Sequence, residues 1–494
     1  MRLRHVVIIS SLLLSRSASG AHDAPPPSRW LLGPLYGTGC PAYGNCGNPV
    51  ASSMRREVEY DLDQLSQRDF PISAYHFDGS SWSTGKCEWA LGDPLIDRLK
   101  SKGIRALLHV WGGCNEIRDA LKLPKKLGTA FGGVYLDEGS TDEDARDAIN
   151  GLRAGNDEVE IVMKAFSNDG QQTTNGLAQF GHSAYVNDVP SDFEGLRLGI
   201  RRVFEMASVI PAPFNEFTGY DKNEVPDEET YYRRLHWGAM QVIMDHTAWR
   251  DADPWQSRYS EALIETYRRY AWLHWQLVPY LYSYDFDAWE TGHPVFRSPN
   301  FDEFTVKLGE EIFVAYVTQP GVTRLPVTLP EGEWVDFWDE SRVVSGRIDQ
   351  PVPLGREPIF IKNGALIPMQ VERGYTGHGS EGSKGSLTVL VFPHGASRFR
   401  YRDEGNFWVD FTASASDTVL RLEARPHPSQ PILYRIARVM SEPNGVRLDP
   451  SGAVIVGNGS SLPRAPDAET CYRSPASNWF YDAPARRLIV KVVH

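Results

Sequence analysis

The sequence predicts an α/β fold in which a (β/α)8 barrel of the TIM type is followed by two all-β sandwich domains. Over about the first 290 residues, short apolar runs alternate with helical patterns, as in a parallel sheet. About eight such units fit a closed barrel. Near Pro294 the helical patterns end, and short alternating runs typical of antiparallel strands begin. An open doubly wound sheet is the alternative, but no glycine-rich phosphate fingerprint supports its nucleotide-binding version.

The first 21 residues are typical of a secretory signal. Met1 to His5 is basic, Val6 to Leu14 is apolar, and Ser19 to Ala21 fits a small-residue cleavage site. The apolar run is too short to span a bilayer. We therefore expect a signal peptide over residues 1–21 and a secreted or luminal protein. A buried N-terminal strand or a misassigned start is the alternative.

The barrel is expected over residues 28–290, with elements assigned from hydrophobic spacing. The expected strands are Arg29 to Leu35, Phe70 to Phe77, Ile104 to Val110, Gly132 to Leu136, Val159 to Met163, Ser183 to Asn187, Glu205 to Ile210 and Gln241 to Met244. The expected helices are Ser53 to Gln67, Pro94 to Lys102, Asp142 to Arg153, Phe193 to Arg202, Glu229 to Met240 and Tyr259 to Tyr284.

Two β-sandwiches are expected after the barrel, a proximal one over residues 291–370 and a distal one over residues 386–494. Their strands are assigned from short runs of alternating or continuous apolar residues. The segment Val371 to Gly385 contains five glycines and is expected to be a linker or an exposed loop.

Two of the barrel strands end on an aspartate. One run is Phe131-Gly-Gly-Val-Tyr-Leu-Asp137, and the other is His182-Ser-Ala-Tyr-Val-Asn-Asp188. The C-terminal ends of the strands are where a (β/α)8 enzyme keeps its catalytic residues. Retaining cleavage of a glycosidic bond needs a carboxylate nucleophile and a carboxylic acid about 5–5.5 Å apart. Asp137 and Asp188 therefore predict glycosidase chemistry.

Structural roles for the same residues remain open. Asp137 could be a loop-capping aspartate, and Asp188 could form an Asx turn or cap the helix that follows it. Glu138 and Asp192 are the nearest competitors for the two catalytic roles.

The composition of the chain restricts which kinds of molecule it is expected to bind. The formal net charge of -12 argues against nucleic acid and anionic membranes. No later run is long and apolar enough to span a membrane. No metal-ligand spacing is present, and we expect no metal and no cofactor. The expected partner is an oligosaccharide or glycoside substrate, and the oligomeric state is not predicted.

An oxidising compartment would allow disulfides among four of the five cysteines, namely Cys40, Cys46, Cys87 and Cys114. Four cysteines have three possible connectivities. A Cys87–Cys114 bridge would join the loops after the second and third strands, and Cys40 and Cys46 offer competing partners. Cys471 would remain free.

Several stretches resemble glycoside hydrolase family 31, the α-glucosidase and α-xylosidase family. The likeness runs from about Trp30 to Val492, and its strongest stretches lie outside the pocket. The stretches are Tyr267 to Tyr282, Thr291 to Arg297, Trp334 to Trp338, Arg356 to Pro368, Arg400 to Gly405 and Trp479 to Asp482.

The resemblance implies roles for matching residues. It makes Asp137 the nucleophile and Asp188 the acid/base. It makes Asp78 and His246 ligands of sugar hydroxyls, and Arg233 the arginine of the family's barrel-wall motif. Arg233 and Lys164 are therefore also expected to bind substrate. For Asp78 a solvated turn, for Arg233 a helix-surface charge and for His246 a structural histidine are the alternatives.

The chain also departs from the family pattern. Lys164 stands where the family usually has arginine, and it lacks the bidentate fork of a guanidinium. Asn215 begins a motif in which no aspartate matches the family's aspartate after strand seven. The family's N-terminal β-sandwich has no counterpart in the sequence. Trp111, near a predicted loop end, could stack on a sugar ring, although core packing explains aromatics as well.

These observations predict a secreted retaining α-glycosidase that hydrolyses α-linked glucosides or related sugars by double displacement. A catalytically inactive carbohydrate-binding protein on the same fold and a transglycosylase are the alternatives. The sequence does not identify the sugar or the linkage.

Overall fold

The structure is a computed structural model of the 494-residue chain. It describes residues 28–38, 51–77, 91–110, 124–136, 159–165, 183–186, 188–219, 225–248, 252–457, 459 and 461–493. The predicted signal segment and the predicted helix Asp142 to Arg153 lie outside the described residues.

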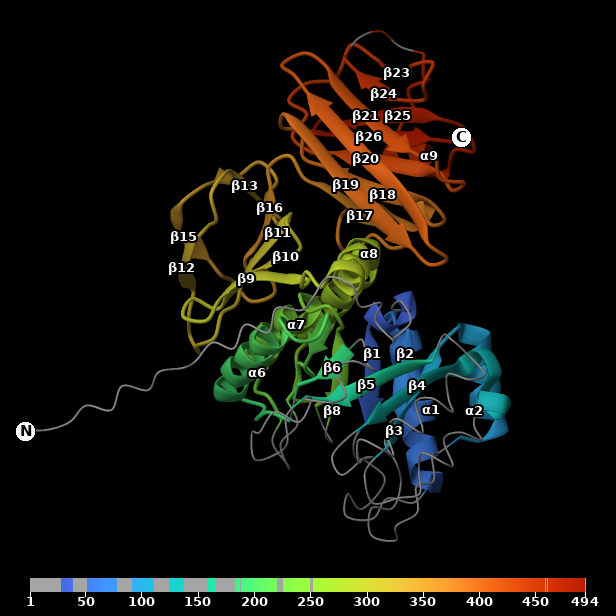
Figure 1. Cartoon of the computed structure of the whole chain (residues 1–494), viewed down its shortest axis with the longest axis vertical. Coiled ribbons are helices and arrows are strands. Elements are labelled where there is room, and N and C mark those ends of the chain that lie inside the picture. Colours follow the sequence, from blue (N-terminus) through green and yellow to red (C-terminus); the bar gives the residue numbers. More distant parts are fainter. Residues whose placement is uncertain are drawn as a thin grey trace, which may run out of the picture.

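Eight parallel strands form the barrel in the lower part of Figure 1, in the order β7-β6-β5-β4-β3-β2-β1-β8. The sheet closes between β7 and β8 through one bridge that joins Glu216 and Asp245, where the Phe217 amide donates to the Asp245 carbonyl at 3.1 Å. The strands are β1 (Leu35–Thr38), β2 (Ala74–Phe77), β3 (Arg105–Val110), β4 (Phe131–Leu136), β5 (Glu160–Lys164), β6 (Ser183–Tyr185), β7 (Ala212–Phe214) and β8 (Asp245–Ala248).

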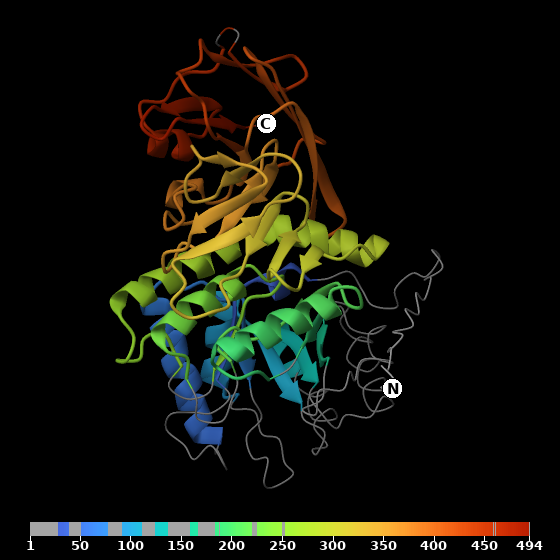
Figure 2. The same ribbon diagram turned by 90° about the vertical axis from the view of Figure 1, so that its left-hand side faces the viewer.

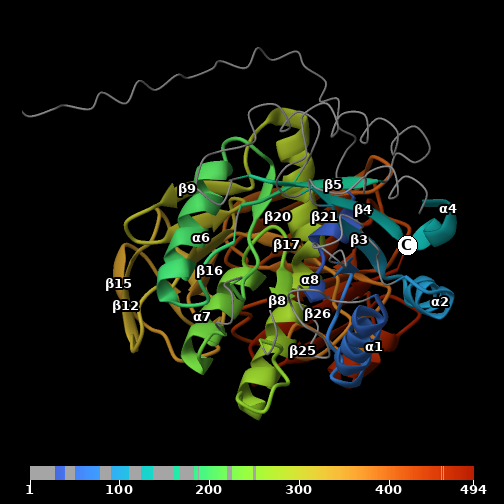
Figure 3. The ribbon, with the colours of Figure 1, turned by 90° about the horizontal axis from the view of Figure 1, so that it is seen from below.

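Helices α6, α7, α8, α1, α2 and α4 flank the strands in the view from below in Figure 3. The longest of them, α8, lies between the barrel and the β-sheets that follow it (Figure 2). The helical elements of this part are η1 (Arg29–Leu32), α1 (Ala51–Gln67), α2 (Asp93–Lys102), α4 (Pro124–Leu127), η2 (Gly128–Ala130), α6 (Phe193–Met206), α7 (Glu228–Ala239) and α8 (Glu261–Thr291). The predicted fold class is therefore confirmed for the barrel.

Three predicted strands are wrong in position. Residues 29–32 form a 3-10 helix, residues 205–206 end α6, and residues 241–244 precede β8. In each case the true strand begins several residues later than predicted. Short apolar runs do not distinguish a strand from a buried helix end, and the inward face of β8 is polar rather than apolar. Hydrophobicity alone therefore placed these strands too early.

The remaining strands form the two predicted β regions. In the first, a six-stranded sheet and the β12–β15 pair enclose an apolar cluster that includes Phe313, Trp334 and Phe360. Its strands are β9 (Phe296–Asn300), β10 (Thr305–Leu308), β11 (Ile312–Ala315), β12 (Arg324–Thr328), β13 (Trp334–Asp336), β14 (Val343–Val344), β15 (Arg347–Pro351) and β16 (Ile359–Lys362).

The second region contains two five-stranded sheets, in the orders β17-β18-β22-β26-β25 and β19-β20-β21-β24-β23. Its pairings are antiparallel except that of β18 with β22, which is parallel. The elements are β17 (Leu366–Met369), η3 (Glu381–Ser383), β18 (Leu387–Val391), β19 (Ala396–Asp403), β20 (Phe407–Ala415), β21 (Leu420–Arg425), β22 (Ile432–Ile436), β23 (Val446–Leu448), β24 (Val454–Val456), α9 (Ala468–Arg473), β25 (Asn478–Asp482) and β26 (Arg487–Val492).

The glycine-rich segment 371–385, predicted to be a linker or an exposed loop, is a loop that is partly buried. Val371 and His378 are buried, and Arg373 pairs with Asp69 of the barrel at 2.8 Å. The Thr376 hydroxyl donates to the side chain of Gln276 on α8 at 2.6 Å. Glycines indicate turns but do not indicate burial. The contacts of this segment with Asp69 and Gln276 join the distal region to the barrel.

Candidate active site

The inward-facing side chains at the C-terminal ends of the strands form a polar and aromatic layer. Strand register pairs Lys164 with Tyr185 and His109 with Tyr135, and paired residues of parallel strands point to the same face. The rings of Tyr135 and Tyr185 lie 5.4 Å apart, and His76 stacks on Tyr135 at 4.8 Å. This layer lies where (β/α)8 enzymes carry their active sites.

Asp188 lies in this layer, three residues beyond the end of β6. The Tyr185 hydroxyl donates to its Oδ1 at 2.8 Å, and the Lys164 ammonium nitrogen lies 3.6 Å from its Oδ2. The Asp188 side chain is 35% exposed, whereas that of Lys164 is 6% exposed. A ligand in the barrel mouth could therefore reach the carboxyl group, while the lysine supports it from below.

The helix-capping role belongs to Asp192 rather than to Asp188. Asp192 is the N-cap of α6, and its Oδ1 accepts from the Gly195 amide at 2.8 Å. This contact satisfies one of the free amides at the helix start. Asp192, and not Asp188, is therefore the residue that caps α6.

Glu216 is a further carboxyl group of the layer and was missed from the sequence. It follows β7, is fully buried, and hydrogen-bonds to Tyr185. Burial raises the pKa of Glu216 well above its usual range, the charge of Asp188 raises it further, and the bond to Tyr185 opposes both. The raised pKa favours the protonated form of Glu216, and Tyr185 links this group to Asp188. The sequence signal for Glu216 is an acidic residue within the apolar run after β7, whereas comparison with the family motif singles out Asn215.

Strand β8 contributes a second buried acid. The Thr247 hydroxyl donates to Asp245 Oδ1 at 2.9 Å and lies 3.1 Å from His76 Nδ1. Burial raises the pKa of Asp245 to about 7, although the Thr247 bond opposes the shift. His76 reaches across β1 because position 37 is glycine, where a Cβ would lie 2.8 Å from the His76 Cβ.

His246 does not join Asp188, because alternation on β8 turns it to the opposite face. It is fully buried against α8, with its ring stacked on Tyr36 at 4.4 Å and its Nδ1 3.2 Å from the Tyr267 hydroxyl. Burial lowers the pKa of His246 to about 3. The inward-facing residues of this strand are Asp245 and Thr247.

Arg233 also lies away from the layer, on the outer side of the barrel. Its Nη1 is 3.3 Å from Glu357 Oε1, and its Nη2 donates to the carbonyls of Val322 and Val352 at 2.9 and 3.0 Å. These partners belong to the proximal β region. The structure therefore gives Arg233 a role in joining that region to α7.

The neighbouring Arg234 lies beneath the site. It donates to the carbonyls of Phe217 at 3.2 Å and Asp192 at 2.8 Å, and also to that of Pro190. Burial lowers its pKa to about 10, against the opposing effect of Glu216. Arg234 thus ties together the segments that carry Asp188 and Glu216. Arg233 and Arg234 are adjacent residues of the same type, so the sequence does not indicate which of them lies beneath the site.

Three predicted site residues lie outside the described residues, each directly after a described strand end. Asp78 follows β2, Trp111 follows β3 and Asp137 follows β4. The four cysteines of the predicted disulfides are also outside, and Cys471 is buried and free. Within the described part of the chain, no helix is long and apolar enough to cross a membrane.

Among the described residues, one cluster of buried carboxylates could hold a cation. Glu57, Asp61 and Asp253 have oxygens within 4.8 Å of one another. The Tyr75 hydroxyl donates to Asp61 at 2.6 Å and the Tyr36 hydroxyl to Asp253 at 2.5 Å. Because Tyr36 and Tyr75 point outward from β1 and β2, this cluster lies outside the barrel wall and is not part of the site.

Two substitutions of Glu216 test whether its carboxyl group positions Tyr185 in the neutral form or acts in the ionised form. In Glu216→Gln we expect kcat within about 3-fold of wild type, because a neutral amide can still bond to Tyr185. In Glu216→Ala the loss of a buried hydrogen bond, about 1–3 kcal/mol, should lower kcat by about 5- to 150-fold. Steady-state kinetics of both variants measure this. Equal losses in the two variants would contradict the positioning role.

The difference in stability between Glu216→Gln and wild type should depend on pH. The folded-state pKa of Glu216 lies above its ordinary value of 4.5, so the stability contributed by this group is present below pH 4.5 and is lost as the pH rises. Glu216→Gln should therefore gain stability relative to wild type between pH 4 and pH 7, as measured by urea unfolding. A constant difference over this range would show that the carboxyl group is ionised in the folded protein.

Comparisons with known proteins agree with this architecture. The family model described as the glycosyl hydrolases family 31 TIM-barrel domain matches residues 170–284, and the family 31 C-terminal domain matches residues 290–367. An isomaltosyltransferase of Sporosarcina globispora is 24% identical over 445 residues, which is 83% of this chain and 37% of that protein. A 1,3-alpha-isomaltosidase of Kribbella flavida is 31% identical over 28% of this chain and 22% of its own length.

Solved structures show the same fold. The cycloalternan-forming enzyme of Listeria monocytogenes, in complex with a pentasaccharide substrate, superposes with a TM-score of 0.74 at 16% identity. It covers 95% of this chain, and this chain covers 54% of it. A family 31 dextranase of Flavobacterium johnsoniae gives a TM-score of 0.73 at 17% identity, with 95% and 70% covered.

The chain spans 22% and 37% of the length of the first two curated relatives. The two family models adjoin each other at the end of α8, where the barrel gives way to β9. Residues 170–284 and 290–367 therefore match the barrel and C-terminal domains of glycoside hydrolase family 31, and the barrel topology agrees with this match.

Proposed function

We propose that this chain processes α-linked glycosides by a retaining double displacement. The observation that carries the proposal is the placement of Asp188, a half-exposed carboxyl group at the mouth of a (β/α)8 barrel, beside Lys164 and Tyr185. Asp137, the residue after β4, is the proposed nucleophile.

In the first step the Asp137 carboxylate attacks the anomeric carbon while Asp188 gives its proton to the departing glycosidic oxygen. A covalent glycosyl-enzyme forms, and the leaving group departs as an alcohol. In the second step Asp188 takes a proton from water, which attacks the same carbon and releases Asp137. Atoms and charge balance over the two steps.

Lys164 supports this cycle through its charge. As Asp188 gives up its proton, the new carboxylate lies 3.6 Å from the ammonium nitrogen. Because the attraction exists only with the ionised carboxylate, it favours proton transfer as the bond breaks. Tyr185, held by Glu216, donates to the same carboxyl group and fixes its orientation.

The relatives support an α-linked gluco-oligosaccharide as the substrate. They include an isomaltosyltransferase, a 1,6-alpha-glucosyltransferase and an alpha-glucosidase. Transfer to a sugar acceptor is the second candidate, because the isomaltosyltransferase matches 83% of this chain. The two candidates share the covalent intermediate and differ only in whether water or a sugar attacks it.

Labelling with 5-fluoro-α-glucosyl fluoride tests the proposal. The reagent should form a stable adduct with the nucleophile, and peptide mass spectrometry should find it on Asp137. Asp137→Ala should lose both labelling and turnover with an unchanged melting temperature. An adduct on another acid, such as Glu138, would contradict the assignment. Binding of isomaltooligosaccharides without labelling or turnover would instead indicate an inactive carbohydrate-binding protein.

Product analysis separates the two candidates. With isomaltotriose as the sole substrate, a hydrolase should release glucose in proportion to bonds cleaved. A transferase should form longer oligosaccharides whose share rises with substrate concentration, because the acceptor competes with water for the intermediate.

A further inference from the structure

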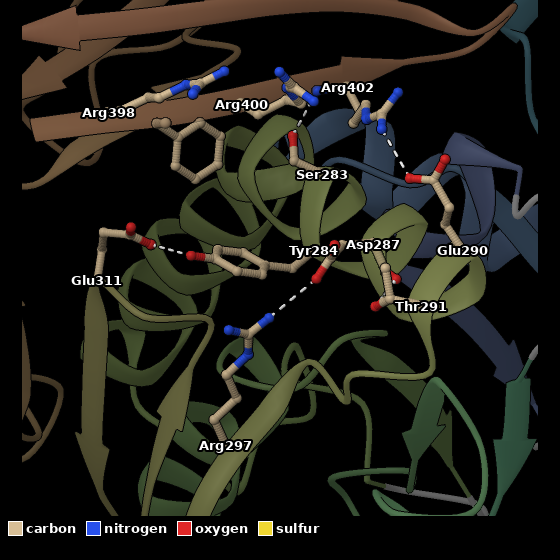
Figure 4. Close-up of a pocket in the computed structure, with 11 residues that line it drawn as sticks. Ser283, Tyr284, Asp287, Glu290, Thr291, Arg297, Glu311, Arg398, Arg400 and Arg402 are labelled. Carbon is tan, nitrogen blue, oxygen red and sulfur yellow. Dashed lines mark hydrogen bonds and ion pairs between the residues drawn. The ribbon is translucent and has the colours of Figure 1, made fainter. Parts of the chain in front are cut away.

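A second cavity lies far from the strand ends, where α8 meets the two β regions. Its volume is about 440 Å³, within the range of pockets that hold small molecules. None of its lining residues belongs to a barrel strand or to a loop that follows one. Figure 4 shows the lining residues Ser283, Tyr284, Asp287, Glu290, Thr291, Arg297, Glu311, Arg398, Phe399, Arg400 and Arg402.

The side of the cavity formed by α8 and β9 is held in place by mutual contacts. Arg297 pairs with Asp287 at 3.2 Å and with Glu310 at 2.7 Å, and its guanidinium lies 4.8 Å from the centre of the Tyr284 ring. The Tyr284 hydroxyl donates to Glu311 at 2.6 Å. These polar groups are fixed before any ligand arrives, which lowers the entropic cost of binding.

The opposite side is formed by β19, where Arg398, Arg400 and Arg402 alternate along the strand and share one face. Asp410 on β20 accepts from Arg398 at 2.7 Å and from Arg400 at 2.9 Å, and Arg402 pairs with Glu290 on α8 at 2.8 Å. Arg398 and Arg400 are 59% and 47% exposed. A guanidinium has five N–H donors, so these arginines retain donors for a ligand.

The charges around the cavity balance. Arg297, Lys307 and the three arginines of β19 are matched by Asp287, Glu290 and Glu311 in the lining and by Glu310 and Asp410 behind it. An anion would be repelled by the carboxylates, and a cation by the guanidinium groups. A neutral molecule dense in hydroxyl groups can accept from the arginines and donate to the carboxylates. Tyr284, which is partly exposed, adds apolar surface for the C–H face of a sugar ring.

We propose that this cavity is a second carbohydrate site, which binds a neutral oligosaccharide through one or two sugar rings. It lies outside the proposed active site and contributes no reacting group. A fixed second site on the same protein raises the effective concentration of a long glucan at the barrel, but gives no advantage with a short substrate. This second site goes beyond the proposed function. Only the choice of α-glucan probes rests on that function.

The test is retention of the full-length protein in native gels that contain dextran or soluble starch. Wild type should be retarded by at least one polymer. Arg400→Ala, which removes exposed donors, should lower the apparent affinity at least 5-fold. Thr291→Trp, which fills the cavity from an exposed position on α8, should do the same.

Arg425→Ala is the matched control, since Arg425 is 54% exposed on the same sheet and does not line the cavity. It should bind like wild type. All variants should hydrolyse a nitrophenyl α-glucoside at the wild-type rate, because that substrate is too small to need the second site. If the chain proves to have no turnover at all, polymer retention still tests the cavity alone.

Three retention results would overturn the inference. These are no retardation of wild type in either polymer, equal retardation of wild type and both cavity variants, and loss of retention on addition of sulfate but not of isomaltotetraose. The last result would make the cavity an anion site. A fall in nitrophenyl glucoside turnover with Arg400→Ala would also contradict it, since the residue would then act on the active site.

Discussion

Asp188→Asn is expected to lower kcat by about 10²- to 10⁴-fold on oligosaccharides, the range that a general acid–base group contributes. The carboxyl group that protonates the leaving oxygen would become an amide, which keeps the Tyr185 contact but cannot transfer a proton. A 2,4-dinitrophenyl α-glucoside should lose much less in the first step, because its leaving group departs without protonation. Steady-state kinetics on both substrates, with burst measurements on the aryl glucoside, determine the difference.

Azide gives the second readout. An azide ion needs no base to attack the glycosyl-enzyme, so it should restore turnover of the aryl glucoside in Asp188→Asn and yield the α-glycosyl azide. The control is Asp192→Asn, which keeps the cap of α6 and should retain wild-type kinetics. Equal losses on both substrates and no effect of azide would contradict the acid/base role of Asp188.

The sequence indicated where Asp188 lies in the barrel but not where Glu216 lies. Asp188 was found because a strand-like run that ends on a carboxylate has a positional meaning in a barrel. Glu216 was missed because β7 has only three residues and the predicted strand lay earlier, at Glu205 to Ile210. Because β7 was predicted at the wrong residues, the direction of the Glu216 side chain relative to the barrel could not be inferred.

Alternation explains the other differences. A one-residue shift along a strand turns a side chain to the opposite face, and this is the difference between His246, which packs against α8, and Thr247, which faces the barrel. Adjacent helical residues diverge in the same way, since Arg233 contacts the proximal region and Arg234 the loops of the site. Residue type and motif do not contain this information, because it depends on the register of each element.

Arg233→Met is expected to destabilise the protein by about 3–5 kcal/mol, the cost of removing one partner from a buried ion pair. Glu357 is fully buried and also accepts from the Tyr270 hydroxyl at 2.5 Å. Burial raises the pKa of Glu357, while the Tyr270 bond and the charge of Arg233 oppose that rise. Without the arginine the pKa should rise further, and the carboxyl group would be buried without its counterion. Urea unfolding measures the loss.

The sign of the pH dependence follows from this rise. A carboxyl group whose folded-state pKa is raised loses its contribution to stability as the pH increases, so the deficit of Arg233→Met should be larger at pH 8 than at pH 5. The double variant Arg233→Met/Glu357→Leu replaces the pair with apolar side chains and should recover most of the loss. KM should stay at the wild-type value in whatever fraction is folded, because Arg233 faces Val322 and Val352 rather than the barrel mouth. A raised KM with unchanged unfolding would instead give Arg233 the substrate-binding role that the family resemblance implies.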